Sequence, residues 1–314
     1  PDIAGATLPD DGCGRSAAQC QGDILLILLI SGAHGFTGRH LMNMARAQGY
    51  AVHALRADLM QPDDLRNEVA QVNPDFVVHL AGVSFVGHAE IDAFYRINVL
   101  GSLHLLDALA SLDTKPQSIL MASSANVYGN CAESPITETQ SPAPVNHYAA
   151  SKLVMEHLAR TRLDDLPVFF TRPFNYTGVG QSPDFLIPKL VQHFAARSTV
   201  VELGNMDVER EFNDVRFVCD AYLRLLQRAT PGEAYNLCTG RTYSLREVLT
   251  MLTDLTGHPV EARVNQAFVR PHEISHLCGD SAKLLNCIGS VNHFELRDTL
   301  NWMLQEQKRV NTPH

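Results

Sequence analysis

Residues 24–38, ILLILLISGAHGFTG, join an apolar run to a glycine-rich turn. Seven consecutive apolar residues are typical of a strand covered on both faces, as in a parallel sheet between two helical layers. Gly32, Gly35 and Gly38 then allow the backbone to turn sharply and to approach a pyrophosphate. The amphipathic stretch 38–48 predicts a helix whose positive end faces that anion. This order of elements predicts dinucleotide binding, against the alternative that the glycines serve only the turn.

Short apolar runs alternate with amphipathic stretches beyond this point, which predicts repeated βαβ units. We expect strands at 24–30, 50–55, 76–81, 118–123 and 167–172, and helices at 38–48, 62–71, 91–112 and 148–163. After Arg172 the chain becomes rich in Gly and Pro, but a helix near 217–229 and a strand near 234–238 are predicted to return to the first sheet. The fold class is α/β: a Rossmann-type doubly wound parallel sheet with a smaller, interleaved C-terminal substrate-binding lobe.

The predicted domain organisation has a leader and two lobes. The expected boundaries are a loose leader at 1–22, a dinucleotide-binding Rossmann domain at 23–172 joined by about 212–240, and a substrate-binding lobe at 173–211 and 241–314.

Composition limits the classes of partner. The 314 residues carry a net charge of −9, which argues against nucleic-acid binding. The longest apolar run is far shorter than the roughly 20 residues of a membrane span, and the acidic residues before it are unlike a signal peptide. The seven cysteines are odd in number and contain no C-x-x-C pair, so we expect a reducing, cytoplasmic environment and no structural metal.

The choice of dinucleotide depends on the end of the second strand. A carboxylate there binds the ribose of NAD, whereas a guanidinium suits the 2′-phosphate of NADP. Arg56 lies about where that side chain is expected, and Asp58 follows two residues later. The sequence favours NADP(H), with NAD(H) as the alternative and with Arg56 as a solvated surface charge as the competing interpretation.

Tyr148 and Lys152 are candidate catalytic residues because they lie one turn apart on a predicted helix. A nearby ammonium is expected to lower the pKa of the tyrosine, so that it can donate and accept a proton. Ser123 and Ser124 follow a predicted strand and could orient a substrate carbonyl. Tyr-x-x-x-Lys alone is common by chance, and it becomes specific only together with the glycine turn and the serines.

Motifs in this order resemble the extended short-chain dehydrogenase/reductase family that acts on nucleotide sugars. The resemblance spans about 27–305 and rests on SGAHGFTG (31–38), Asp58-Leu59, HLAGVS (79–84), INVLGSLHLLDA (97–108), SSANVYG (123–129), NHYAASK (146–152), RPFNYTGVGQ (172–181), EREFNDV (209–215), YNLCTG (235–240) and RPHEI (270–274). Within that family the sequence is most similar to the GDP-4-keto-6-deoxymannose reductases, relatives of GDP-mannose 4,6-dehydratase.

The resemblance implies three groups of site residues. The catalytic set is Ser124, Tyr148 and Lys152. Cofactor-binding residues are Gly32, Gly35, Phe36, Thr37, Gly38, Arg56, Asp58, Leu59, Leu80, Ala81 and Gly82, together with Tyr148 and Lys152. Residues that hold the sugar nucleotide are Ser84, Ser124, Asn126, Asn175, Arg210, Arg270 and Glu273. The family also implies a homodimer through the helices at 91–112 and 148–163.

Two departures from the family pattern narrow the chemistry. Related dehydratases carry an acid just after the catalytic Ser or Thr, whereas Ala125 and Asn126 stand here and neither can shuttle a proton. Dehydration is therefore disfavoured. Tyr176 stands where the related reductases usually have His, which predicts a different wall for the pocket.

The resulting hypothesis is NADP(H)-dependent reduction of the 4-keto group of a nucleotide-linked 4-keto-6-deoxyhexose, with GDP-4-keto-6-deoxymannose as the favoured substrate. A nucleotide-sugar 4-epimerase that uses NAD is the nearest alternative, and a catalytically inactive dinucleotide sensor is the distant one. Retention of all three candidate catalytic residues argues against the sensor.

Several histidines lie in patterns that could be mistaken for metal or ligand sites. His272, Glu273 and His276 form an H-E-x-x-H pattern, but Ala282 stands where a metzincin has its third histidine, so a zinc protease is disfavoured. His79 and His104 lie in apolar runs and are interpreted as packed residues.

Overall fold

A computed structural model describes residues 25–84, 90–269, 274 and 276–310. At its centre lies a sheet of six parallel strands in the order β10-β5-β4-β3-β1-β2. The strands are β1 (Ile27–Ser31), β2 (Ala51–Ala54), β3 (Phe76–His79), β4 (Ser118–Ala122), β5 (Val168–Pro173) and β10 (Ala234–Leu237). The chain order reverses between β1 and β3, which makes this the topological switch point where α/β sheets bind ligands.

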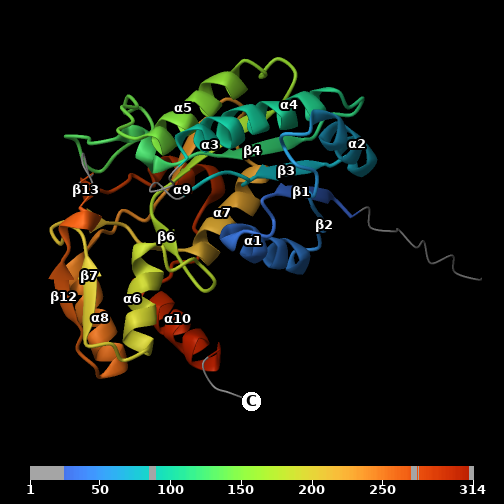
Figure 1. The fold of residues 1–314 in the computed structure, drawn as a ribbon. Coiled ribbons are helices and arrows are strands. Elements are labelled where there is room, and N and C mark those ends of the chain that lie inside the picture. Colours follow the sequence, from blue (N-terminus) through green and yellow to red (C-terminus); the bar gives the residue numbers. More distant parts are fainter. Residues whose placement is uncertain (1–24, 85–89, 270–273, 275, 311–314) are drawn as a thin grey trace, which may run out of the picture.

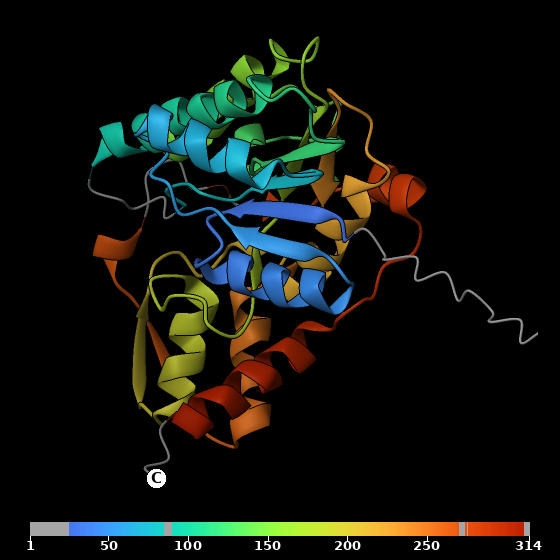
Figure 2. The same cartoon turned by 90° about the vertical axis from the view of Figure 1, so that its right-hand side faces the viewer.

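Helices cover both faces of the sheet (Figure 1). One layer contains α2 (Pro62–Val72), α3 (Ile91–Tyr95), a π-helical turn η1 (Arg96–Gly101), α4 (Ser102–Ala110) and α5 (His147–Arg160), and the other contains α1 (Phe36–Ala47), α7 (Val215–Leu226) and α9 (Ala282–Ile288). Alternate strand residues serve the two layers: Leu28 and Ile30 pack toward α1 and α7, whereas Leu29 packs toward α2 and α4. Figure 2 shows the two layers above and below the strands.

A second lobe lies beside the α1 layer in both views (Figures 1 and 2). It contains α6 (Leu186–Ala195), α8 (Leu245–Thr256), α10 (Leu296–Val310), η3 (Gln266–Phe268), the pair β7 (Val200–Leu203) and β12 (Glu261–Val264), and the small sheet of β8 (Glu209–Arg210), β11 (Tyr243–Ser244) and β13 (His276–Leu277). These elements enclose their own apolar core. The pair β6 (Tyr176–Thr177) and β9 (Asn213–Asp214) connects the lobes.

Local sequence explains several boundaries. Ser244 and Glu247 form a capping box at the start of α8, and Gly257 ends that helix at a φ of 62°. Pro62 begins α2, where the missing N–H costs nothing, and the Asn146 side chain caps α5 by accepting from the Ala149 N–H at 2.8 Å.

The expected fold class is confirmed, including the return of α7 and β10 to the first sheet. The expected helix at 91–112 is instead three segments, because η1 interrupts it. The domain boundaries stay a prediction; α9, which they assign to the second lobe, packs with Leu284 and Ile288 in the α1–α7 core. Among the described residues, none of the helices has the length and apolar character that crossing a bilayer requires.

Candidate active site

The glycine turn after β1 forms a cradle against the end of β3. Gly32 has a φ of +69°, and a Cβ there would lie 2.7 Å from the backbone nitrogen of Ala81. A Cβ on Gly38 would collide with the Gly32 carbonyl. Both positions therefore require glycine, one for conformation and close approach and the other for packing of the helix on the turn.

The first turn of α1 presents free donors at this cradle. Gly35 is the N-cap and offers no side-chain acceptor. Within the described residues, the N–H groups of Phe36, Thr37 and Gly38 have no acceptor, since the first backbone bond of the helix is from the Arg39 N–H to the Gly35 carbonyl. Unpaired donors at the positive end of a helix fit the pyrophosphate of a dinucleotide.

The three expected catalytic residues meet at the carboxyl edge of the sheet. Ser124 is the second residue after β4, and its hydroxyl interacts with the phenol of Tyr148 in the first turn of α5. One turn later, Lys152 Nζ donates to the Ala122 carbonyl at 2.9 Å. A Cβ on Gly82 would lie 3.3 Å from the same Nζ, so the segment after β3 borders the lysine. All three side chains are buried.

Burial controls the titration of Tyr148 and Lys152 and corrects one expectation. The pKa of Tyr148 is raised by burial, which outweighs the opposing interaction with the Ser124 hydroxyl. The expected lowering of this pKa by Lys152 is therefore wrong for the arrangement seen, in which the ammonium donates to the Ala122 carbonyl. Burial also lowers the pKa of Lys152 to about 8, against the opposing charge of Glu156.

His79, at the end of β3, belongs to a buried chain of hydrogen bonds. Its Nδ1 lies 2.6 Å from Ser31 Oγ, which accepts from the Ala81 N–H, and its Nε2 lies 2.8 Å from Ser102 Oγ, which donates to the Asn98 carbonyl. Because Ser102 donates its proton to Asn98, Nε2 must donate to Ser102, and Nδ1 of a neutral ring accepts from Ser31. Burial and, second, the charge of Lys152 lower its pKa to about 3, which agrees.

The chain of hydrogen bonds continues through Asn98 in η1 to α5. Asn98 Oδ1 accepts from the Val83 N–H at 2.8 Å, and its Nδ2 donates to the Val83 carbonyl and to Ser151 Oγ. Ser151 in turn donates to the Tyr148 carbonyl at 2.8 Å. A fully buried amide thus ties the segment after β3 to the helix that carries the candidate catalytic tyrosine.

The expected cofactor residues beyond the cradle differ in their surroundings. Arg56 is exposed, and no partner for its guanidinium is found in the part of the chain that the structure describes. The Asp58 carboxylate accepts from the Met60 N–H at 2.9 Å within a local turn. The Leu59 side chain is buried under Gly101. Leu80 and Ala81 are half-buried beside the cradle, and Gly82 is exposed.

The expected substrate residues surround the trio only in part. Asn126 donates to Ser124 Oγ at 3.1 Å, and the Asn175 carbonyl accepts from the Asn213 N–H between β6 and β9. Arg210 is half-buried on β8, whereas Ser84 is exposed. Arg270 and Glu273 lie outside the described residues.

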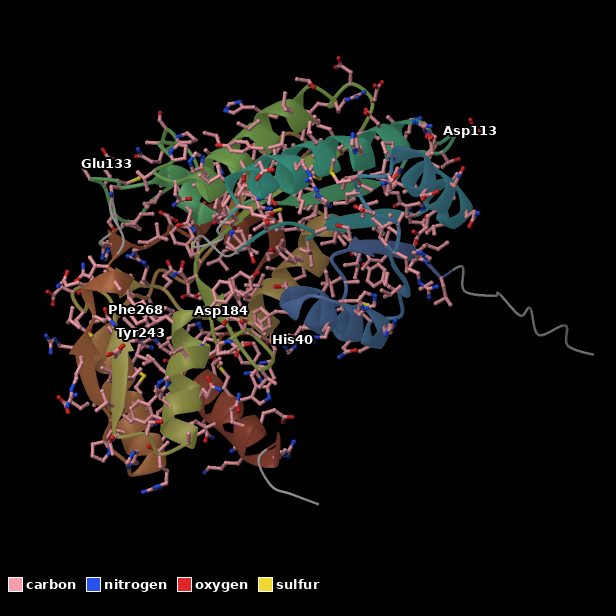
Figure 3. The ribbon with its side chains drawn as sticks, viewed as in Figure 1. His40, Asp113, Glu133, Asp184, Tyr243 and Phe268 are labelled. Carbon is pink, nitrogen blue, oxygen red and sulfur yellow. The ribbon has the colours of Figure 1, made fainter. Side chains whose placement is uncertain are left out.

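Tyr176 joins the cradle to the second lobe. Its phenol lies 2.8 Å from Thr37 Oγ1, its ring stacks on Phe36 at 6.0 Å, and burial raises its pKa. His40 on α1 continues the contact by bonding to the Val179 carbonyl and packing on Trp302 of α10. Figure 3 shows His40 on α1 where that helix approaches the second lobe.

Of the zinc-protease pattern only His276 is described, since His272 and Glu273 lie outside the described residues. His276 lies in the strand β13 and not on a helix, and its ring contacts Ser134 Oγ at 3.0 Å and Glu209 at 3.2 Å. Across the described ranges, no cluster of three metal-ligating side chains occurs. His79 and His104 are packed as expected, and both also form hydrogen bonds.

A comparison with known protein families identifies the family of this chain. The model of the NAD dependent epimerase/dehydratase family matches residues 28–238, from β1 through β10. The chain belongs to that family. As a member, it is an NAD(P)-dependent enzyme of the extended short-chain dehydrogenase/reductase type, which confirms the expected family and class.

Three relatives of this epimerase/dehydratase family member are informative. It is 34% identical over 273 residues to GDP-6-deoxy-D-talose 4-dehydrogenase from Aggregatibacter actinomycetemcomitans, covering 85% of the chain and 92% of the relative. It is 34% identical over 295 residues to GDP-6-deoxy-D-mannose reductase from Pseudomonas aeruginosa, covering 89% and 96%. The structure of RMD from Pseudomonas aeruginosa complexed with NADPH superimposes with a TM-score of 0.84 at 33% identity, covering 92% and 100%.

Sequence reasoning missed several residues that this family member places around its site. Asn98 and Ser151 carry the bonds that connect the site, and Glu68 binds the loop that holds Arg56. A signal for Asn98 was available, because a short amide side chain inside the apolar stretch 91–112 is unusual in a helix interior. No local signal marks Glu68, which lies among other acidic residues of α2.

Proposed function

We propose that the protein reduces the 4-keto group of a GDP-linked 4-keto-6-deoxyhexose with NADPH. Two 34% identical relatives are named for the oxidation of GDP-6-deoxy-D-talose at C4 and for the formation of GDP-6-deoxy-D-mannose by reduction. Talose and mannose differ only in the configuration at C4, so oxidation of either sugar at C4 gives the same ketone. The shared chemistry of the relatives therefore supports one keto substrate and leaves the face of hydride addition to the pocket.

The observation that carries the proposal is the meeting of the buried Ser124 hydroxyl and Tyr148 phenol beside the dinucleotide cradle. A ketone oxygen within reach of both hydroxyls would accept two hydrogen bonds, which stabilise the negative charge that grows on it during reduction. Ala125 and Asn126 add no further acid or base, which supports simple reduction over dehydration. When bound, the reduced nicotinamide supplies the hydride.

The protonation states favour reduction as the working direction. Because burial raises the pKa of Tyr148, the phenol holds its proton at neutral pH and is ready to donate it to the developing alkoxide. Lys152, with a pKa of about 8, is mostly charged at pH 7 and would donate to a ribose hydroxyl of the cofactor. Asn98 and Ser151 hold the helix that carries both groups.

The remaining expected residues receive roles under the same proposal. The exposed guanidinium of Arg56 would bind the 2′-phosphate of NADPH. Asn175 and Arg210, with Arg270 and Glu273 outside the described residues, would hold the sugar nucleotide. Bidentate contacts of arginine with a diphosphate would supply much of the affinity.

The test follows loss of NADPH absorbance with purified protein and the GDP-, dTDP- and UDP-linked 4-keto-6-deoxyhexoses. We expect oxidation only when a keto substrate is present, fastest with the GDP sugar. Tyr148→Phe should lower kcat by at least roughly 100-fold, as loss of general acid catalysis does, and leave NADPH affinity within about twofold. Interconversion of the C4 epimers of a nucleotide sugar without net NADPH oxidation would replace this proposal with a 4-epimerase, and a fully active Phe variant would remove Tyr148 from the chemistry.

We also propose that two copies pair through the outer surface of α3, η1 and α5. Ile91, Leu100 and Val154 are exposed by 51%, 45% and 39% on these adjacent helices. Their burial against a second copy would remove apolar surface from water. Sedimentation should give a dimer whose dissociation constant rises by at least roughly tenfold in Leu100→Glu; a monomeric wild-type chain would refute the pairing.

A further inference from the structure

The loop after β2 has an internal carboxylate that faces its backbone. Glu68 reaches this loop from α2, and its Oε2 accepts from the Ala57 N–H at 2.7 Å. The Arg56 N–H lies 3.1 and 3.2 Å from the two carboxylate oxygens, and His53 Nε2 lies 2.7 Å from Oε1. One side chain thus binds two successive amides and the last part of the strand.

This loop is beside the dinucleotide cradle. β2 is the edge strand next to β1, with Ile30 paired to Ala54, and the Leu55 N–H donates to the Ile30 carbonyl at 2.9 Å. Arg56 follows Leu55 directly. Its backbone therefore lies next to the end of β1, the strand that leads into Gly32. The Arg56 side chain is exposed, whereas the Glu68 side chain is only 17% exposed behind it.

The contacts fix the backbone of Arg56 without using its guanidinium. Burial alone would raise the pKa of Glu68, but the bonds from His53, Ala57 and Arg56 outweigh it and hold the pKa below its ordinary value. The carboxylate is therefore charged at neutral pH and satisfied from inside the loop. An arginine on a fixed backbone loses less conformational freedom when it binds an anion than one on a free loop.

We propose that Glu68 is a positioning residue for the cofactor 2′-phosphate: by holding the amides of Arg56 and Ala57 it directs the Arg56 guanidinium to that group. The inference rests on the proposed use of NADPH. Under this proposal the negatively charged Glu68 strengthens binding of the cofactor that carries the additional negative phosphate. Direct electrostatics would have the opposite effect. A carboxylate acting only through its charge would repel the 2′-phosphate instead.

The test measures binding of two fragments to the full chain by calorimetry: adenosine 2′,5′-bisphosphate, which carries the 2′-phosphate, and AMP, which lacks only that group. We expect the wild type to prefer the bisphosphate, and Arg56→Ala to reduce this preference by roughly 10- to 100-fold, the value of a charge-assisted contact. Glu68→Gln should reduce it by roughly three- to tenfold, in line with the cost of ordering one long side chain. In the Arg56→Ala background, Glu68→Gln should change the preference by less than about twofold.

Asp64→Asn is the matched control, because it removes one negative charge from the exposed first turn of the same helix. It should leave the preference within about twofold, as should His53→Ala, which keeps both amide bonds to Glu68. If Glu68→Gln does not fold by circular dichroism, Glu68→Asp, which is one methylene too short to reach both amides, takes its place with the same expected loss.

The outcomes separate this inference from the function on which it rests. A preference that is unchanged or increased in Glu68→Gln, while Arg56→Ala loses it, overturns the role of Glu68 alone. A wild-type chain without any preference for the bisphosphate overturns the proposed use of NADPH and this inference together. The ratio of kcat/KM for NADPH and NADH should fall in parallel with the fragment preference.

Discussion

Lys152 provides a quantitative test of the site because one titration is expected to change stability and activity in opposite directions. The side chain is 6% exposed, and burial lowers its pKa from 10.5 to about 8. A tenfold change in an acid dissociation constant is worth about 1.4 kcal/mol, so the buried ammonium costs the fold about 3 kcal/mol. Lys152→Met keeps the length of the side chain and removes the charge.

The pH dependence of the free energy of unfolding follows from the number of protons that Lys152 binds in the folded and unfolded chain. Below pH 8 the lysine is protonated in both the folded and the unfolded chain, and the full cost is present. Between pH 8 and 10.5 the unfolded chain still holds a proton that the folded chain has lost, so the free energy of unfolding contributed by this group rises with pH. The difference between wild type and Lys152→Met should therefore move by about 2–3 kcal/mol in favour of the wild type from pH 7 to pH 10.

Urea unfolding of both proteins at several pH values measures this difference. The tyrosines and cysteines titrate in both proteins, so their contributions cancel in the difference. Over the same range, kcat/KM of the wild type for NADPH should fall with a midpoint near pH 8, because the ammonium that would hold the ribose is lost. A difference in unfolding free energy that stays flat from pH 7 to pH 10 would refute the claim that Lys152 is buried as a cation.

Three further substitutions test separate parts of the structure. Gly32→Ala should destabilise the fold by about 2 kcal/mol or more and weaken NADPH binding, because it combines a left-handed backbone with a clash at Ala81; unchanged thermal unfolding would count against the cradle. Asn98→Ala should cost about 2–4 kcal/mol in urea unfolding and lower kcat, since buried backbone groups lose their partners. Tyr128→Phe should cost about 1–3 kcal/mol, because Arg172 loses an acceptor at 3.0 Å, with kcat at pH 7 unchanged; an equal loss of kcat would link this distant cluster to catalysis.

The parts of the fold that sequence could predict are those encoded by neighbouring residues. The apolar run before Gly32 and the alternation that follows are local patterns, and each specifies an element regardless of the rest of the chain. The meeting of Ser124 with Tyr148 could also be anticipated, because strand ends and helix starts of a parallel sheet share one edge.

Properties set by burial and by long-range contacts could not be predicted in this way. The direction of the Tyr148 titration depends on how much water the folded site excludes, and spacing from Lys152 contains no such information. The bonds of Glu68 to Arg56 and Ala57 join a helix to a loop 11 and 12 residues away, among other acidic side chains of similar pattern. The break at η1 depends on Asn98 turning inward, which helical periodicity does not reveal.

Buried polar groups connect the two sides of the candidate site through hydrogen bonds. Ser31, His79, Asn98 and Ser102 are almost completely buried between the sheet edge and α4, where apolar side chains would stabilise the fold more simply. Their bonds reach backbone groups of Ala81 and Val83 after β3 and, through Ser151, the carbonyl of Tyr148 on α5. Because each hydroxyl has one proton to give, the chain of bonds has a single direction and fixes both sides together. A shift of the segment after β3 would therefore move α5 or leave a buried donor unpaired, so the distance between cradle and phenol is set by the fold before any ligand binds.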